Sequence, residues 1–265
     1  SMLCYACLWS ISYLGQKSSY NNHYYLMFLL CWFSVFIPAN KRFSLDAKQG
    51  RVQEVGELPF YINYFYVFVF GIVYFYAAKN KIYPDWIDGR FIELSTKGNA
   101  VTSIPVLNWV FSQQWYPLLV AYSAIIFDGL IIPALIWKPT RKLAIAFSFV
   151  FHMYNSIVYQ VGVFPYMSLS LLIFFLADSW LEKWIGPPNL KNTAKGGWNI
   201  TLPVFTIILV LNFLIPLRNH FIEGNVFYTE EGHRCSWRMM LRSKSGYCNI
   251  LVEREDGKRE WISLA

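Results

Sequence analysis

The chain has 265 residues, of which 55% are hydrophobic, 19% aromatic and only 15% charged. Soluble domains carry nearer a quarter of charged residues, so this composition excludes an ordinary soluble domain and predicts a membrane protein. The formal net charge is +7. The basic residues are scattered over loops and the tail, so no nucleic-acid partner is expected, and membrane lipid accounts for the charge better.

Apolar runs recur along the chain. Residues 2–14 are apolar but too few to cross about 30 Å of hydrocarbon unaided. Lipid offers backbone groups no hydrogen-bond partner, and continuous long runs are typical of helices, whereas barrel strands would alternate over about ten residues. The sequence therefore predicts an all-α polytopic membrane helical bundle over residues 1–217. The six runs long enough to span are 22–38, 59–78, 116–137, 142–160, 163–178 and 199–217.

The last segment, 218–265, is polar and mixed, which predicts a small extramembrane unit. Asp256-Gly257 stands between two alternating runs and is typical of a β-hairpin turn. Cys235 and Cys248 also lie here. An oxidising compartment would permit a disulfide between them, but their spacing does not require one.

Lysine and arginine are distributed unevenly between alternating loops. They concentrate in the loops at 41–51, 138–142 and 183–195. By the positive-inside rule these loops are cytoplasmic. The loop at 79–97 and the C-terminal segment are then extracytoplasmic, that is, periplasmic or lumenal.

Polar side chains in or beside the spans are candidates for function, because they are costly in lipid and usually face a cavity or a partner. Taken alone they leave structural roles open. Lysines at span ends commonly anchor the helix at the interface, and a lone histidine there is often a structural hydrogen-bonding group. The candidates are Asn21, Asn22, His23, Lys79, Lys81, Asp128, His152, Tyr154 and Asn155.

Four blocks of sequence carry a resemblance to a known family. They are SSYNNHYYLMFLLCWFSVFIPANKRFSLD, GIVYFYAAKNKIYPDWIDG, FHMYNSIVYQVGVFPYMSL and TEEGHRCSWRMMLRSKSG. In order and spacing they resemble the vitamin K-dependent gamma-glutamyl carboxylases, whose shared region is the horizontally transferred transmembrane (HTTM) domain, over about residues 10–264. The TEEGHR and PANKRFSLD variants are closer to bacterial members. Compared with the family, the chain is interpreted as lacking the first helices and most of the lumenal domain.

The resemblance implies a reaction. Family members oxidise reduced vitamin K with O₂ to its epoxide, and a base formed on the way removes a γ-proton from a glutamyl side chain, which takes up CO₂. The implied catalytic lysine, five residues before the Trp of the DW pair, is Lys81, and the implied active-site histidine is His23. Lys81 must act as the free amine, a form that removal from water favours. The reduced quinone would be phylloquinol or menaquinol, and no metal is expected.

The resemblance also implies a quinone cavity. Asn21 and Asn22 are expected to donate hydrogen bonds to a quinone oxygen, and His152 and Asn155 to line the same cavity.

In the C-terminal segment, the resemblance implies a stretch that folds over the active site. Trp237, Met239 and Met240 are expected to contact the quinone. Arg242 and Lys244, which stand where the family has a histidine and an arginine, are expected to bind the carboxylate of a glutamyl peptide or protein.

Three functions remain open from the sequence. The leading one is a quinol-oxidising, carboxylase-like membrane enzyme, either coupled to glutamate carboxylation or restricted to epoxidation. The second is a non-catalytic membrane scaffold. The third is a haem-binding membrane protein with His23 and His152 as axial ligands, which would show a Soret band.

Overall fold

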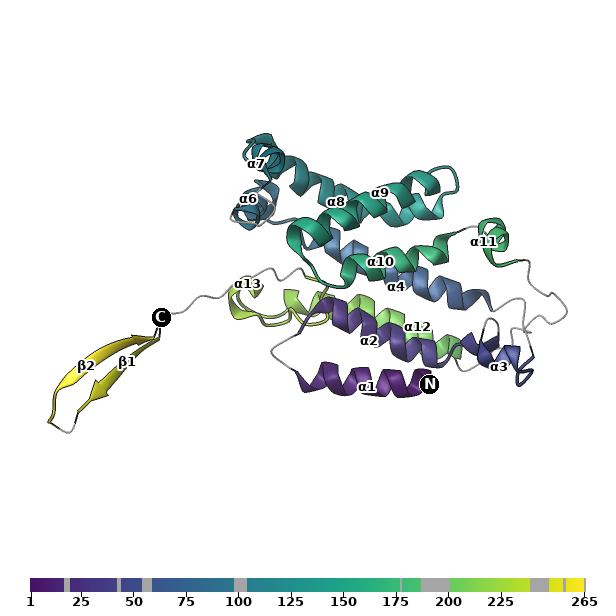
Figure 1. Ribbon diagram of the computed structural model, residues 1–265, viewed down its shortest axis with the longest axis horizontal. Coiled ribbons are helices and arrows are strands. Elements are labelled where there is room, and N and C mark those ends of the chain that lie inside the picture. Colours follow the sequence, from purple (N-terminus) through teal and green to yellow (C-terminus); the bar gives the residue numbers. More distant parts are fainter. Residues whose placement is uncertain are drawn as a thin grey trace.

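The computed structural model is predominantly helical, with helices side by side in one bundle and a two-stranded hairpin at the C-terminal end (Figure 1). The predicted all-α membrane bundle with a small C-terminal β-hairpin is confirmed. The structure describes residues 1–16, 20–41, 44–53, 59–97, 104–176, 178–186, 201–238, 248–254 and 256–264.

Three long apolar helices form the framework. They are α4 (Phe60–Lys79), α8 (Trp115–Ile136) and α12 (Thr201–Leu214), which continues into the 3₁₀ turn η5 (Ile215–His220). Within the described part of the chain, these are the helices that are individually long and apolar enough to cross a membrane. They coincide with three of the six predicted spans.

The other three predicted spans are shorter or broken. Helix α2 (Asn22–Val35) qualifies as a span only together with its bent continuation at residues 39–48. The run at 142–160 is helical over residues 141–159 as an α-helix followed by a π-helix, and the run at 163–178 is helical over 164–175. Gln160 (φ 49°) and Gly162 (φ 71°) turn the chain between them. Length and composition therefore support three spans, or four with the bent pair. The short helices of these two runs are α9 (Arg141–Tyr154), π-helix η3 (Asn155–Tyr159), α10 (Phe164–Leu171) and η4 (Leu172–Phe175).

Short helices cover the two ends of the bundle. Helices α3 and α11 and the turn between α8 and α9 lie at one end, whereas α6, α7 and α13 lie at the other, with the C-terminal segment (Figure 1). The basic residues Lys48 of α3, Lys138 of the turn after α8 and Lys183 of α11 thus lie at the end opposite the hairpin. The remaining short elements are α1 (Met2–Gly15), η1 (Ala39–Lys41), α3 (Leu45–Lys48), α5 (Pro84–Ile87), α6 (Arg90–Thr96), α7 (Pro105–Phe111), α11 (Asp178–Ile185) and α13 (Val226–Thr229).

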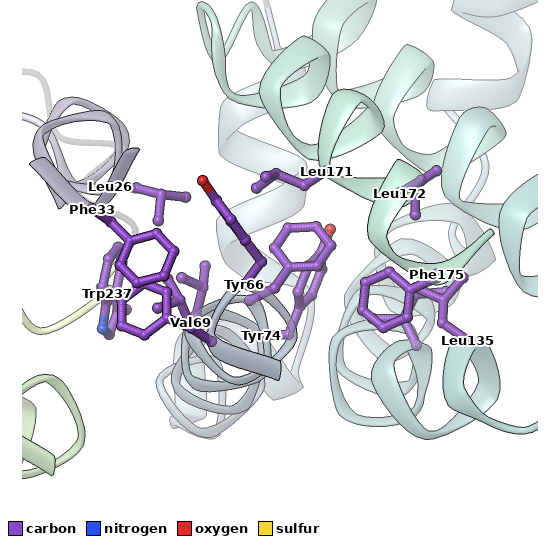
Figure 2. Packing of buried hydrophobic residues seen from close by; sticks show 14 of the residues in the cluster. Leu26, Phe33, Tyr66, Val69, Tyr74, Leu135, Leu171, Leu172, Phe175 and Trp237 are labelled. Atoms are coloured by element: carbon purple, nitrogen blue, oxygen red, sulfur yellow. The ribbon is translucent and has the colours of Figure 1, made fainter. Parts of the chain in front are cut away.

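The main core surrounds α4. Figure 2 shows α4 residues with Phe33 and Leu26 of α2 on one side and Leu171, Leu172 and Phe175 on the other. Phe33 stacks on Phe65 of α4, with ring centroids 3.5 Å apart. Stacked aromatic pairs add about 0.5–1.5 kcal/mol each beyond the area they bury. The packing fixes α4 in the middle of the bundle and so fixes whatever follows its last turn.

The C-terminal strands form the predicted hairpin. β1 (Cys248–Glu253) and β2 (Arg259–Leu264) pair antiparallel, in a register from Cys248 opposite Leu264 to Glu253 opposite Arg259. Gly257 takes φ 76° in the turn, a conformation that glycine adopts without steric cost. Cys235, the possible disulfide partner of Cys248, is a free thiol.

Candidate active site at the C-terminal end of α4

Lys81 follows the last turn of α4, and the chain then reverses direction. Tyr83 is extended (φ −147°) and Pro84 opens α5, as expected because a residue before proline avoids the helical region and proline suits a first helical turn. The reversal brings Trp86 back over the lysine. The Lys81 Nζ atom lies 5.3 Å from the centre of the Trp86 ring, and Trp86 Nε1 donates a hydrogen bond to the Ala121 carbonyl at 3.0 Å.

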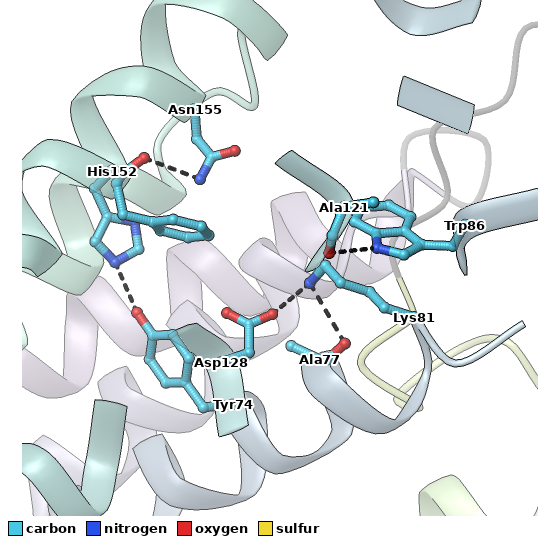
Figure 3. A network of polar contacts seen from close by, with 9 residues as sticks. Tyr74, Ala77, Lys81, Trp86, Ala121, Asp128, His152 and Asn155 are labelled. Carbon is cyan, nitrogen blue, oxygen red and sulfur yellow. Dashed lines mark hydrogen bonds and ion pairs between the residues drawn. The ribbon is translucent and has the colours of Figure 1, made fainter. Parts of the chain in front are cut away.

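Helix α8 supplies a carboxylate to Lys81. Its buried positions include Ala121, Ala124, Asp128 and Ile131, whose spacing of three and four residues puts them on one face. The two alanines belong to a small core with Trp86 of α5 and Ile92 of α6. Lys81 Nζ forms an ion pair with Asp128 Oδ2, and the two residues are only 5% and 4% exposed (Figure 3).

The ion pair changes the expectation for Lys81. To act as the base that the resemblance implies, Lys81 needs a group that can take its proton, and the Asp128 carboxylate is in contact with it. Transfer of the proton from Lys81 to Asp128 turns an ion pair into a neutral pair and leaves the net charge of the buried site unchanged. Asp128 is therefore the group that could accept the proton of Lys81 and leave its side chain as the free amine.

A second polar pair lies on the same face of α4. Tyr74 is seven residues, or about two helical turns, before Lys81, and its hydroxyl lies 2.7 Å from His152 Nε2. His152 is 1% exposed. Figure 3 shows Asp128 between Lys81 and the pair formed by Tyr74 and His152. Polar side chains from α4, α8 and α9 thus converge inside the bundle.

His23 is connected to His152 through one aromatic ring. It stacks on Phe164 with ring centroids 4.4 Å apart, and Phe164 meets His152 edge-on at 5.8 Å. The Nδ1 atoms of both histidines are buried without a hydrogen-bond partner in the described structure. A haem held between these two imidazoles would require the space that Phe164 fills.

The two asparagines at the start of α2 form hydrogen bonds to nearby protein groups. Asn21 Oδ1 accepts from the His23 backbone N–H at 2.8 Å and caps the helix. Asn22 Oδ1 accepts from the Tyr20 hydroxyl at 2.7 Å, and its Nδ2 donates to the Arg238 carbonyl at 2.5 Å. Both side chains are therefore engaged with protein atoms.

Asn155 begins the π-helix η3 and is likewise engaged, since its Nδ2 donates to the Phe151 carbonyl at 3.0 Å. Beside it the hydroxyls of Tyr154 and Tyr116 are hydrogen-bonded to each other. Tyr159, the last residue of η3, has a buried hydroxyl without a partner among the described residues. π-Helical turns often occur at functional sites.

The C-terminal segment folds over the C-terminal end of α4, where Lys81 lies. Asn80 Nδ2 donates to the Ser236 carbonyl at 2.9 Å. Trp237 is buried and packs on Tyr25 with ring centroids 5.3 Å apart. Four predicted site residues of this segment lie outside the described residues, namely Met239, Met240, Arg242 and Lys244.

A small pocket opens beside Lys81. Its open space is about 10 Å³, room for roughly one water molecule. Neither His23 nor His152 lines it, so the predicted residues fall into two groups, one at this pocket and one around Phe164. The lining residues are Ala77, Asn80, Lys81, Tyr83, Trp86, Phe91, Phe227 and Arg238.

Comparison with known protein families shows to which family the chain belongs. The HTTM domain matches residues 1–180. The chain belongs to the HTTM family. Residues 198–264 match the lumenal domain of vitamin K-dependent gamma-carboxylase. Together these matches confirm the resemblance to the vitamin K-dependent carboxylase family and make the protein a carboxylase-family membrane protein. No solved structure matches the chain.

The family's substrate can be compared with the pocket in chemical terms. A naphthoquinol needs aromatic surroundings and a proton acceptor, and the pocket offers four aromatic side chains and Lys81. The lining residues therefore have the chemical character that a naphthoquinol requires. The open space is smaller than a bicyclic ring, so the ring would enter only after lining side chains change conformation. In the described part of the chain, no three His, Cys, Asp or Glu side chains could hold a metal ion.

The sequence leaves the partner of one site residue open and gives little sign of another. Asp128 is a candidate as a carboxylate within a span, a feature that calls for a cationic partner, but the sequence does not show that this partner is Lys81. Arg238 gave only a weak signal, a basic residue directly after Trp237.

Proposed function

We propose that this chain is an integral membrane enzyme that oxidises a reduced naphthoquinone, such as phylloquinol or menaquinol, with O₂ to its epoxide, and couples this oxidation to γ-carboxylation of a glutamyl side chain. The observation that best supports this proposal is the buried ion pair of Lys81 and Asp128 beside an aromatic pocket. A scaffold would not need this pair, since a buried pair is seldom better for stability than apolar packing.

The two partners of the ion pair have separate roles in the proposed mechanism. Asp128 accepts a proton from Lys81, and the free amine of Lys81 then accepts the hydroxyl proton of the quinol as a general base. Trp86 holds the lysine by its ring face and excludes water from it. When bound, the quinol supplies the electrons and O₂ the oxygen of the epoxide.

The histidines belong to the proton path in this proposal. Tyr74 and His152 are hydrogen-bonded to each other and lie beside Asp128, so they can hold a proton away from the pocket (Figure 3). His23 continues this group beyond Phe164.

The proposal includes further contacts to the quinone and to the glutamyl substrate. Asn21, Asn22 and Asn155 are proposed to turn toward the quinone when it binds and to donate hydrogen bonds to it. Trp237, Met239 and Met240 contact the quinone, and Arg242 and Lys244 bind the substrate carboxylate.

The test is an assay of the purified chain in lipid nanodiscs. Reduced vitamin K or a menaquinol is supplied under air, and epoxide is measured by mass spectrometry; labelled bicarbonate and a glutamyl peptide form a separate arm. Epoxide above the protein-free level is expected. Its absence with both quinols would contradict the proposal, and a Soret band would favour the haem alternative. Epoxide without fixed carbon would restrict the activity to epoxidation.

Orientation is a second expectation. In a background without native cysteines, Lys258→Cys in the hairpin turn should react with a membrane-impermeant maleimide added to intact cells. Lys138→Cys, in the basic turn after α8, should react only after permeabilisation. Both positions are exposed, so protection reports the side of the membrane. The opposite labelling pattern would place the C-terminal segment in the cytoplasm.

A further inference from the structure

Arg238 is held at the mouth of the Lys81 pocket by its own backbone. Its carbonyl accepts the hydrogen bond from Asn22 Nδ2, and the residue before it, Trp237, is buried with φ 57°. The guanidinium lies over the ring of Phe227, 5.6 Å from its centre. Arg238 and Lys81 thus enter the same pocket from the C-terminal segment and from α4.

The charges around this pocket do not balance. Lys81 is matched by Asp128. Arg238 has no ion pair with a carboxylate in the described structure, and its Nε is buried without a hydrogen-bond partner. Its Nη2 reaches only a neutral amide, the Asn219 oxygen at 2.9 Å, once that amide is oriented to donate to Pro216. The lining therefore has one cation in excess.

The positive charge of Arg238 is unfavourable without a nearby anion. Burial lowers the pKa of the Arg238 guanidinium, and Tyr83 opposes this with a smaller effect. An arginine still stays protonated in proteins. Arg238 is half-buried, and a cation that is partly removed from water is stabilised by an anion that arrives beside it.

We infer that Arg238 is the anion-binding group of this pocket, and that its ligand is the ionised hydroxyl of an aromatic alcohol. The inference rests on the proposed function, in which Lys81 takes the hydroxyl proton. In that step the ligand O–H bond breaks and an N–H bond forms on Lys81, while the electron pair stays on the ligand oxygen as a negative charge. Arg238 stabilises that charge. The four aromatic side chains of the lining favour an aromatic ligand over an acyclic carboxylate.

The test uses 2-methyl-1-naphthol, whose absorption changes when its hydroxyl ionises. Binding at a pH where the naphthol is neutral is measured first, and the bound naphthol is then titrated in nanodiscs. Bound to the wild-type protein, it should ionise with a constant at least tenfold larger than in protein-free nanodiscs. Arg238→Gln and Arg238→Met, which keeps an unbranched side chain without the charge, should remove most of that gain, and Arg238→Lys should retain part of it.

The matched control is Arg234→Gln, four residues earlier, because Arg234 lies over Tyr20 and does not line the pocket. It should leave the ionisation constant unchanged. Naphthol that binds wild type without a gain in ionisation would overturn the role of Arg238 while the quinol pocket stands. Naphthol that does not bind at all would overturn both. Loss of glutamyl-peptide binding in Arg238→Gln, with naphthol ionisation unchanged, would assign Arg238 to a carboxylate instead. The wild-type comparison decides even if a variant fails to fold.

Discussion

Lys81→Arg is expected to abolish epoxide formation while the protein still folds. Arginine keeps a positive charge for the ion pair with Asp128, but it cannot take up a proton near neutral pH. Loss of a general base typically lowers the rate about 10²- to 10⁴-fold. The measurement is the initial rate of epoxide formation in nanodiscs, normalised to folded protein by size-exclusion chromatography.

Alanine at the same position is a harsher change. Lys81→Ala leaves the Asp128 carboxylate buried without its partner, and breaking a buried pair in this way costs about 3–5 kcal/mol of stability. It should be as inactive as the arginine variant and less stable. A small primary amine that enters the vacated space should restore part of the rate.

Lys79→Arg is the matched control, two residues away on the same turn. Lys79 is partly exposed, and its Nζ contacts His220 Nε2 at 2.5 Å outside the Lys81 pocket. Its substitution should leave the epoxidation rate unchanged within about twofold. A wild-type rate in Lys81→Arg would return both lysines to the role of interface anchors and leave the chain without an assigned base.

Local sequence signals account for the parts of this structure that depend on neighbouring residues. Pro84 starts α5 shortly after the end of α4, and that reversal places Lys81 against Trp86. The Asp256-Gly257 pair likewise specified the hairpin turn. In both cases the backbone preferences of a few adjacent residues suffice.

Hydropathy gives less information about where a helical run changes its hydrogen bonding or ends. The apolar run at 142–160 contains no proline or charged residue past its first position, yet α9 ends at Tyr154 and a π-helix follows. A count of apolar residues does not register a change of helical hydrogen bonding or a left-handed residue such as Gln160. The next run, predicted at 163–178, is helical only over 164–175 and is therefore shorter in the structure.

The partners of the polar residues depend on packing between distant helices. Asp128 lies 47 residues after Lys81, and which carboxylate meets the lysine depends on the faces that α4 and α8 present to each other. The same holds for His23, which meets Phe164 and not the Lys81 pocket. Sequence spacing along one helix carries no information on such contacts.

Asp128→Asn is expected to lower both the rate of epoxide formation and the stability of the protein. An amide cannot accept the lysine proton, so the rate should fall at least about 10²-fold. It also leaves the buried ammonium of Lys81 without a counter-charge, for which the loss of stability is about 3–5 kcal/mol. The measurements are the epoxidation rate and a detergent-based unfolding titration. Asp88→Asn, at an exposed acid beside the same turn, should change neither.

A double variant separates the two effects of Asp128. Lys81→Met combined with Asp128→Leu replaces the ion pair with apolar side chains, a change that is often neutral or stabilising in a buried site. The double variant should therefore be more stable than Asp128→Asn or Lys81→Ala, and still inactive, because it has no base. Contacting residues typically show coupling free energies of about 0.5–3 kcal/mol in such cycles. Additive losses of stability would mean that the two side chains do not form a pair in the membrane. A higher epoxidation rate in Asp128→Asn would mean that the carboxylate restrains the lysine as its ammonium form and that Lys81 works better without it.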